Sequence, residues 1–359
     1  MRNVQSNSTL YEPSVSVIVT VYNGLSEGLK ECLKSISEQS LSKLQLIVVD
    51  DCSNDGSSEF AEDFTNSIGG TFIHHTKNKG LSASLNDGIR ASYGEYILIL
   101  QQDWILFENS SIKDSIKILE SMKDEGILIG RQNYELKKLN FYQKFVELRL
   151  GHIYLNTIQK GQIGLTENKC DLLKRETIIK IGPFDETLRI SGEDQVFSHK
   201  VADLGLPMTL SDAPMYFNTL TGENSFKGII HKEIVYGKYS APLFTGIYSK
   251  KKHSKNKTNY IKVKIRNRII SVTVTLLVII SFLSSLILNN IDFLMFLVIG
   301  TALRGIFITK ELKILKKNKI ILQINIILSI LLSVLLDILY TVYFAYGIIS
   351  NIGKPKITA

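Results

Sequence analysis

The chain has 359 residues, with 42 Lys or Arg against 34 Asp or Glu, which gives a formal net charge of +8. Hydrophobic residues make up 45% and charged residues 21%, which excludes a disordered chain, because disorder requires low hydrophobicity. Six prolines exclude collagen-like and Pro-rich architectures. Three cysteines without a CxxC pair exclude a disulfide framework and a cysteine-based zinc site.

Apolar, β-branched runs alternate with helical patterns in the first hundred residues. The runs predict strands at 15–21, 44–49, 71–75 and 96–100. Helices are predicted at 29–36, 58–66 and 81–91, the first from apolar residues spaced by three and four positions. This alternation predicts an α/β fold with a mostly parallel sheet flanked by helices. Ligands of such sheets bind beyond the carboxyl ends of the strands.

Polar and acidic residues follow three of the predicted strands. They are the stretches 20–24, 50–51 and 101–103. Asn, Asp and Gly are also common turn formers, so each stretch taken alone can be explained as a turn. Three such stretches at one edge of a sheet predict a ligand site. The chain has neither GxGxxG nor GxxxxGK[ST], so dinucleotide dehydrogenases and P-loop NTPases lack their usual support.

The last third of the chain contains three long apolar segments, 269–289, 291–308 and 320–350. The first has no charged residue over about 31 Å of helix, close to the thickness of a bilayer core. These segments predict about three transmembrane helices, with two or four left open. Segment 250–268 holds nine Lys/Arg and no acid, so the rest of the chain carries a net charge of −1. The basic surplus therefore does not predict a nucleic-acid partner.

Basic segments next to apolar spans remain cytoplasmic and are attracted to anionic membrane lipids. We therefore predict a multi-pass protein of the cell membrane whose N-terminal domain is cytoplasmic. The predicted division is a cytoplasmic domain at 1–230 and an interfacial and basic juxtamembrane segment at 231–268. Transmembrane helices at 269–350 and a tail at 351–359 follow.

Four sequence blocks follow one another over residues 13–206. They are PSVSVIVTVYNG, LQLIVVDDCSNDGS, NKGLSASLNDGIRASYGEYILIL, and KIGPFDETL followed by SGEDQVFSHKVADLGL. In this order the blocks resemble the family 2 glycosyltransferases of GT-A fold. The resemblance implies a nucleotide-diphosphate sugar as donor and inversion at the anomeric carbon of the transferred sugar.

The resemblance also implies which residues bind the donor. A carboxylate such as Asp51 accepts a hydrogen bond from a nucleobase N–H, and Tyr22 offers a stacking face. Gly80 lets the backbone approach a ligand closely, and the helix after it directs its N-terminus at phosphate. The implied nucleotide-sugar-binding residues are Thr20, Tyr22, Asn23, Asp51, Asn78, Gly80, Ser82, Asn86, Gln101 and Gln102.

The family's metal motif, Asp-x-Asp, aligns with Gln101-Gln102-Asp103, so the first acid is missing. Mg²⁺ and Mn²⁺ prefer oxygen ligands and often use one or two carboxylates together with phosphate oxygens. The resemblance therefore implies Asp103 as the ligand of Mg²⁺ or Mn²⁺, with an affinity weakened by Gln101.

The resemblance implies Asp194 as the catalytic base that takes the proton of the attacking hydroxyl. Glu193 and Asp185 are implied on the acceptor side. An isolated Glu-Asp pair at a helix start can also be explained by the helix dipole. No pattern typical of a protein nucleophile accompanies these acids, which agrees with a single displacement.

Together these observations predict an inverting glycosyltransferase that acts on a hydroxyl of a membrane-associated acceptor, a lipid-linked saccharide. Its role would be cell-surface glycan or glycoprotein glycan assembly. Two alternatives stay open: a polyprenyl-phosphate sugar synthase, and a non-catalytic membrane protein that binds nucleotide-sugars. The sequence does not identify the sugar, the nucleobase or the linkage.

Overall fold

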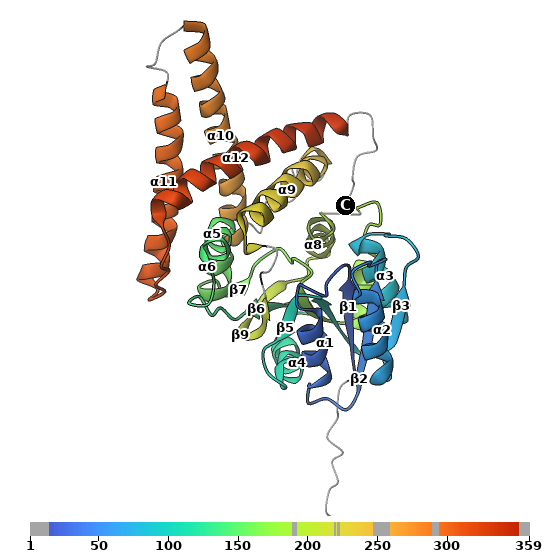
Figure 1. The fold of residues 1–359 in the computed structure, drawn as a ribbon. Helices are drawn as coiled ribbons and strands as arrows, with labels where there is room; N and C mark the ends of the chain where they lie inside the picture. Colours follow the sequence, from blue (N-terminus) through green and yellow to red (C-terminus); the bar gives the residue numbers. More distant parts are fainter. Residues whose placement is uncertain are drawn as a thin grey trace, which may run out of the picture.

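The computed structural model describes residues 14–188, 192–218, 220, 223–246, 259–288 and 294–351. An α/β domain forms one end of the molecule and a group of long helices forms the other (Figure 1). The first part of the predicted basic segment, 250–258, and the tail after Asn351 lie outside the described residues. The division of the chain into the four predicted parts stays a prediction.

The α/β domain is built on a mixed sheet with the strand order β3-β2-β1-β4-β8-β6-β9-β5, and β7 pairs with β9. Strands β3, β2, β1 and β4 are parallel, and β8 inserts antiparallel between β4 and β6. The strands are β1 (Val15–Val21), β2 (Leu44–Asp50), β3 (Thr71–His74), β4 (Tyr96–Gln101), β5 (Trp104–Leu106), β6 (Ile127–Gln132), β7 (Gly161–Gln162), β8 (Cys170–Lys174) and β9 (Met208–Asn218). The predicted α/β fold is confirmed.

Helices cover both faces of the sheet, as the continuous apolar runs of its strands require. Alternate residues of β1 point to opposite faces, so Val17 and Val19 pack in one apolar cluster and Ile18 in the other. The helices of the domain are α1 (Leu29–Ser37), α2 (Ser57–Ser67), α3 (Leu81–Ala91), α4 (Ser111–Ser121), α5 (Phe141–Leu150), α6 (His152–Thr157), α7 (Arg175–Ile181) and α8 (Glu193–Asp203).

The register of the parallel strands brings the polar stretches together at one edge. Thr20 of β1 lies opposite Gln101 of β4, and Val21 lies opposite Asp50 of β2. The carboxyl ends of three strands therefore finish at the same level, as the sequence predicts. Helix α3 packs against β1 so closely that a Cβ atom on Gly88 would collide with Ile18.

Four long helices follow the sheet: α9 (Phe226–Gly246), α10 (Asn259–Leu288), α11 (Leu294–Lys317) and α12 (Ile326–Ser350). In Figure 1, α10 and α11 run side by side, whereas α12 crosses them and lies along α9. Two stretches are long and apolar enough to be candidate membrane spans, Arg268–Ile287 and Ile326–Ser350.

The predicted span at 291–308 is not among these candidates within the described residues. Its described part forms the first half of α11, which contains Arg304 and continues into the charged stretch 310–317. The described helices therefore support two of the three predicted spans.

Candidate active site

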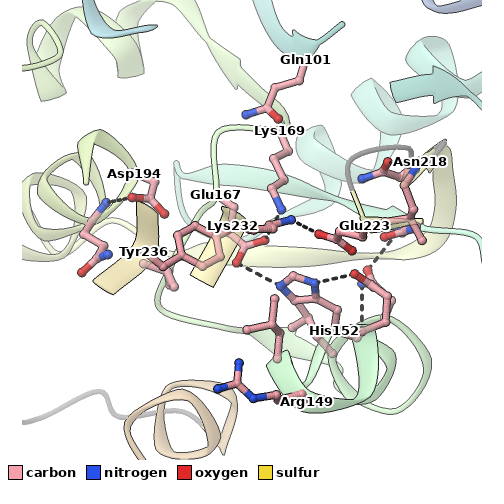
Figure 2. A pocket seen from close by; sticks show the side chains of 18 of the residues that line it. Gln101, Arg149, His152, Glu167, Lys169, Asp194, Asn218, Glu223, Lys232 and Tyr236 are labelled. Atoms are coloured by element: carbon pink, nitrogen blue, oxygen red, sulfur yellow. Dashed lines mark hydrogen bonds and ion pairs between the residues drawn. The ribbon is translucent and has the colours of Figure 1, made fainter. Parts of the chain in front are cut away.

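A cavity of about 990 Å³ lies between the carboxyl edge of the sheet and the C-terminal helices. Side chains from the ends of β4 and β9, from α5, α6 and α8, and from all four C-terminal helices line it. Its volume lies at the upper end of the range of ligand pockets. Figure 2 shows the polar side chains that project into it.

Four of the residues that the sequence singles out lie in the wall of this cavity. Gln101 and Asp103 come from the end of β4 and the turn after it, and Glu193 and Asp194 come from the first turn of α8. The remaining ten are not among the lining residues: Thr20, Tyr22, Asn23, Asp51, Asn78, Gly80, Ser82, Asn86, Gln102 and Asp185.

Asp51 organises the loop that precedes α3. Its carboxylate accepts hydrogen bonds from the backbone N–H of Lys79 at 2.7 Å and of Gly80 at 2.8 Å. A ring nitrogen of His75 lies 2.8 Å from the same carboxylate. Gly80 has a φ of 93°, a conformation that L side chains rarely adopt. The structure thus gives Asp51 a loop-shaping role, and its contact with a nucleoside stays a prediction.

Ser82 and Asn86 connect α3 to the loop before α8. The Ser82 hydroxyl donates to the carbonyl of Leu188 at 3.1 Å. The Asn86 amide donates to the carbonyl of Phe184 at 3.0 Å, and its oxygen accepts from the N–H of Phe184 at 2.9 Å. Asp185, in the same loop, accepts from the backbone N–H of Thr187. These contacts explain the residue types by loop positioning, and roles in ligand binding stay predictions.

Gln102 stabilises the loop after β1 through hydrogen bonds. Its amide oxygen accepts from the backbone N–H of Tyr22 at 2.9 Å, and its amide nitrogen donates to the carbonyl of Tyr22 at 3.1 Å. The same nitrogen donates to Glu27 at 3.1 Å. A Cβ atom on Gly24 would collide with this amide, which explains the glycine. The clamp leaves the Tyr22 ring half exposed beside the strand ends.

Asp103 is the carboxylate that the predicted metal site requires. Burial raises its pKa to about 6, although Lys169 acts in the opposite direction. Within the described residues no lysine or arginine nitrogen forms an ion pair with this carboxylate. A buried carboxylate of this kind fits a divalent cation. The described residues contain no group of three His, Cys, Asp or Glu side chains that could hold a metal ion.

Glu193 and Asp194 begin α8, where the cap residue Gly192 has a φ of 101°. The Asp194 carboxylate accepts from the backbone N–H of Gln195 at 2.8 Å (Figure 2). Burial and the charge of Asp194 raise the pKa of Glu193 to about 8. Glu193 therefore holds a proton near neutral pH.

The cavity also holds ionisable residues that the sequence analysis missed. Lys169 lies 2.9 Å from Glu167, and Lys232 pairs with Glu223 (Figure 2). Burial and the neighbouring Lys169 lower the pKa of Lys232 to about 8. These residues belong to segments without a recognisable motif, so only their position in the fold reveals them.

Asp171 and His152 add two further buried groups. Burial raises the pKa of Asp171 to about 7, and its Oδ1 atom has no hydrogen-bond partner among the residues that the structure describes. Burial opposes the charged form of His152, but the carboxylates of Glu147 and Glu167 on either side raise its pKa overall. The cavity therefore contains both proton donors and charged groups near neutral pH.

Comparison with known proteins identifies the α/β domain. The family model described as glycosyl transferase family 2 matches residues 16–182. The "Glycosyltransferase GlyG" of Streptococcus pneumoniae is 35% identical over 130 residues, which cover 36% of this chain and 42% of that protein. The "Uncharacterized glycosyltransferase RT0329" of Rickettsia typhi is 30% identical over 183 residues, 50% of this chain and 56% of that protein. The chain thus spans about half the length, or less, of these curated relatives.

A solved structure shares the fold over most of the chain. The mannosyltransferase PcManGT from Pyrobaculum calidifontis, in complex with GDP-Man and Mn²⁺, aligns with a TM-score of 0.59 and 16% identity. The alignment covers 95% of this chain and 88% of that one, so the likeness includes C-terminal helices as well as the sheet.

Proposed function

We propose that the chain is a membrane-anchored, inverting glycosyltransferase, because the family model described as glycosyl transferase family 2 matches residues 16–182. It would move a sugar from a nucleotide-diphosphate sugar to a hydroxyl of a membrane-held acceptor, a lipid-linked saccharide. The role proposed for it is cell-surface glycan or glycoprotein glycan assembly.

One observation carries this proposal. A single cavity has Asp103 and Asp194 in one part of its wall and side chains of α10, α11 and α12 in another. A soluble acceptor would not require this continuity, whereas an acceptor anchored in lipid must reach the catalytic groups from the membrane side. The basic residues around the candidate spans favour a cytoplasmic position for the α/β domain.

The donor is proposed to lie at the carboxyl ends of β1, β2 and β4, next to Asp51 and Asp103. PcManGT is bound to GDP-Man and Mn²⁺, which supports a nucleotide-sugar and a divalent cation for this chain also. Asp103 would hold the cation, with Gln101 in place of a second carboxylate. When bound, Mg²⁺ or Mn²⁺ neutralises the charge that develops on the departing diphosphate.

Asp194 is proposed as the general base. The acceptor hydroxyl attacks the anomeric carbon from the side opposite the diphosphate, and its proton passes to the Asp194 carboxylate as the new bond forms. A base in hydrogen-bond reach accelerates such a step by about 10²–10⁴. Glu193, which keeps its proton near neutral pH, would donate a hydrogen bond to the acceptor and orient it.

The test compares two Asp→Asn variants of the same helix, Asp194→Asn and the exposed Asp203→Asn. The full-length protein in detergent is given a panel of nucleotide-sugars, and both donor binding and transfer to membrane-lipid extracts are measured. We expect Asp194→Asn to bind donor normally and to lose about 10²-fold or more of kcat, because only the base is removed. Asp203→Asn should match the wild type. Wild-type turnover in Asp194→Asn would exclude this residue as the base.

A further inference from the structure

Five charged side chains from five helices meet at the membrane-helix end of the cavity. Arg149 of α5 forms ion pairs with Glu233 of α9 at 2.8 Å and with Asp337 of α12 at 2.9 Å. Arg268 of α10 pairs with Glu233 at 2.9 Å, and Arg304 of α11 pairs with Asp337. We call these five residues the arginine cluster. It ties the α/β domain to all four C-terminal helices.

The two signs of charge in the arginine cluster face different directions. Arg149, Arg268 and Arg304 all line the large cavity, whereas Glu233 and Asp337 do not. The two carboxylates are buried behind the guanidinium groups. A further acid, Glu311, lines a small separate hollow on the other side of Arg149 and Arg304. The cavity therefore meets positive charge at this end and acidic residues at the end formed by Asp103, Glu193 and Asp194.

One N–H group of Arg304 contacts no acceptor among the described residues, although its other nitrogens bind Asp337. Its side chain is almost fully buried, and its Nη1 atom has no hydrogen-bond partner among the described residues. A guanidinium group presents five N–H donors in a planar fork that matches the oxygen atoms of phosphate. A buried, incompletely satisfied donor next to two further arginines is the arrangement that an anionic ligand completes.

The surroundings of the arginine cluster are apolar. Ile269 and Val272 of α10 and Phe344 of α12 line the same end of the cavity. Arg268 is the first residue of a candidate span and stacks on the ring of Tyr340 at 4.0 Å. An anion held here would sit at the boundary between the polar lining of the cavity and apolar side chains of α10 and α12.

We propose that the arginine cluster binds the phosphate group of a long-chain lipid acceptor, a polyprenyl phosphate or a polyprenyl diphosphate that carries a saccharide. This inference rests on the proposed function and specifies its acceptor. The phosphate sits against Arg149, Arg268 and Arg304. In the lipid that carries a saccharide, the reacting hydroxyl points along the cavity toward Asp194, whereas in a polyprenyl phosphate the reacting oxygen is one of the phosphate itself. Both lipids share the same anionic group, so the experiment distinguishes them.

The full-length protein is placed in nanodiscs of phosphatidylcholine, and the binding of three probes is compared: undecaprenol, undecaprenyl phosphate, and undecaprenyl diphosphate carrying one sugar. The variants are Arg268→Gln, Arg268→Lys and, as the matched control, Lys316→Gln. Lys316 is exposed on α11 and outside the cavity, so its loss tests general attraction of charge to the membrane. Arg268 is one third exposed, and Glu233 keeps its ion pair with Arg149 when Arg268 is replaced, so no carboxylate of the arginine cluster loses all of its partners.

We expect the wild type to bind one or both phosphate lipids at least about 10-fold more tightly than undecaprenol, as charge-assisted hydrogen bonds require. Arg268→Gln should lose about 10-fold or more of this preference, Arg268→Lys less, and Lys316→Gln none. Equal binding of undecaprenol and the two phosphate lipids, or equal losses in Arg268→Gln and Lys316→Gln, would overturn the proposal.

Transfer assays with the same probes separate this proposal from the proposed function. Transfer onto the sugar of the diphosphate lipid would support both the site and the proposed hydroxyl acceptor. Transfer onto undecaprenyl phosphate would support the site and contradict the proposed hydroxyl acceptor. Selective binding of phosphate lipids without transfer from any nucleotide-sugar would support the site and contradict the proposed function. Transfer that shows no preference for phosphate lipids would support the function and overturn the site.

Discussion

The buried carboxylate of Asp337 should contribute more to stability than any exposed acid of the chain. It accepts hydrogen bonds from Arg149 at 2.9 Å, from Arg304 and from the Ser271 hydroxyl at 2.8 Å, and its side chain is inaccessible to solvent. Asp337→Asn keeps the size of the side chain but removes its charge and turns one oxygen acceptor into a donor. Three arginines then face the single carboxylate of Glu233, and Arg304 loses the ion pair that it forms with Asp337.

Removal of one partner from a buried ion pair costs about 3–5 kcal/mol, because an uncompensated charge stays buried. For a chain of this size we expect the midpoint of thermal unfolding to fall by roughly 5 °C or more. The measurement is far-UV circular dichroism of the full-length protein in detergent, without donor. The control is Asp114→Asn, which removes an exposed acid paired with Lys117 at 2.7 Å and should cost at most about 0.5 kcal/mol.

A double variant tests whether the uncompensated buried charge is the cause of the stability loss in Asp337→Asn. Asp337→Leu combined with Arg304→Met replaces one buried pair by apolar side chains, which is often neutral for stability. We expect this protein to be more stable than Asp337→Asn. A midpoint for Asp337→Asn equal to that of Asp114→Asn would show that the arginine cluster is not a stabilising network, and the reasoning would fail.

Three further predictions concern the α/β domain. Burial and Asp194 raise the pKa of Glu193 from 4.5 to about 8, so the unfolded chain releases this proton at a lower pH than the folded protein does. The wild type should therefore lose thermal stability relative to Glu193→Gln as the pH rises between these two values. A difference in stability that does not change with pH would contradict the raised pKa. Asp51→Asn should lower the stability of the donor-free protein by about 1–3 kcal/mol, because the Gly80 N–H loses its acceptor, and loss of donor affinity alone would exclude this loop-shaping role. Gly88→Ala should cost about 1–3 kcal/mol in chemical unfolding through overpacking against Ile18, and an unchanged midpoint would contradict the close packing of α3.

The parallel half of the sheet is readable from the sequence because its signals are local. The helix Leu81–Ala91 has the predicted bounds, and the predicted strands 44–49 and 96–100 each extend by one residue. Each of these elements has an apolar pattern within its own few residues, and this pattern predicts whether the segment is a helix or a strand. The antiparallel insertion of β8 between β4 and β6 has no such local signal, since it depends on pairing between distant segments.

The residues of the candidate site are also predictable from the sequence only in part. Asp103 and Asp194 lie in sequence blocks that resemble a known family, and the structure has both residues in the wall of one cavity. Lys169 and Lys232 lie in segments without a motif, so the sequence gives no reason to select them. Asp337 does stand out, since it interrupts a long apolar run and a charge in such a run requires a partner. The identity of that partner, Arg149, comes from a helix 188 positions away and follows only from the fold.

Two neighbouring residues of helix α9 lie in different places, one in the cavity and one in the arginine cluster. Lys232 projects into the cavity, and Glu233, the next residue, is held by Arg149 and Arg268. Helix α9 also packs along α12, one of the candidate spans (Figure 1). Since a helical segment moves as a stiff rod, a sideways force from the bilayer on α12 would shift the Lys232 ammonium group as well. If these candidate spans lie in a bilayer as proposed, the thickness and lateral pressure of the lipid would have a mechanical route to the proposed catalytic site.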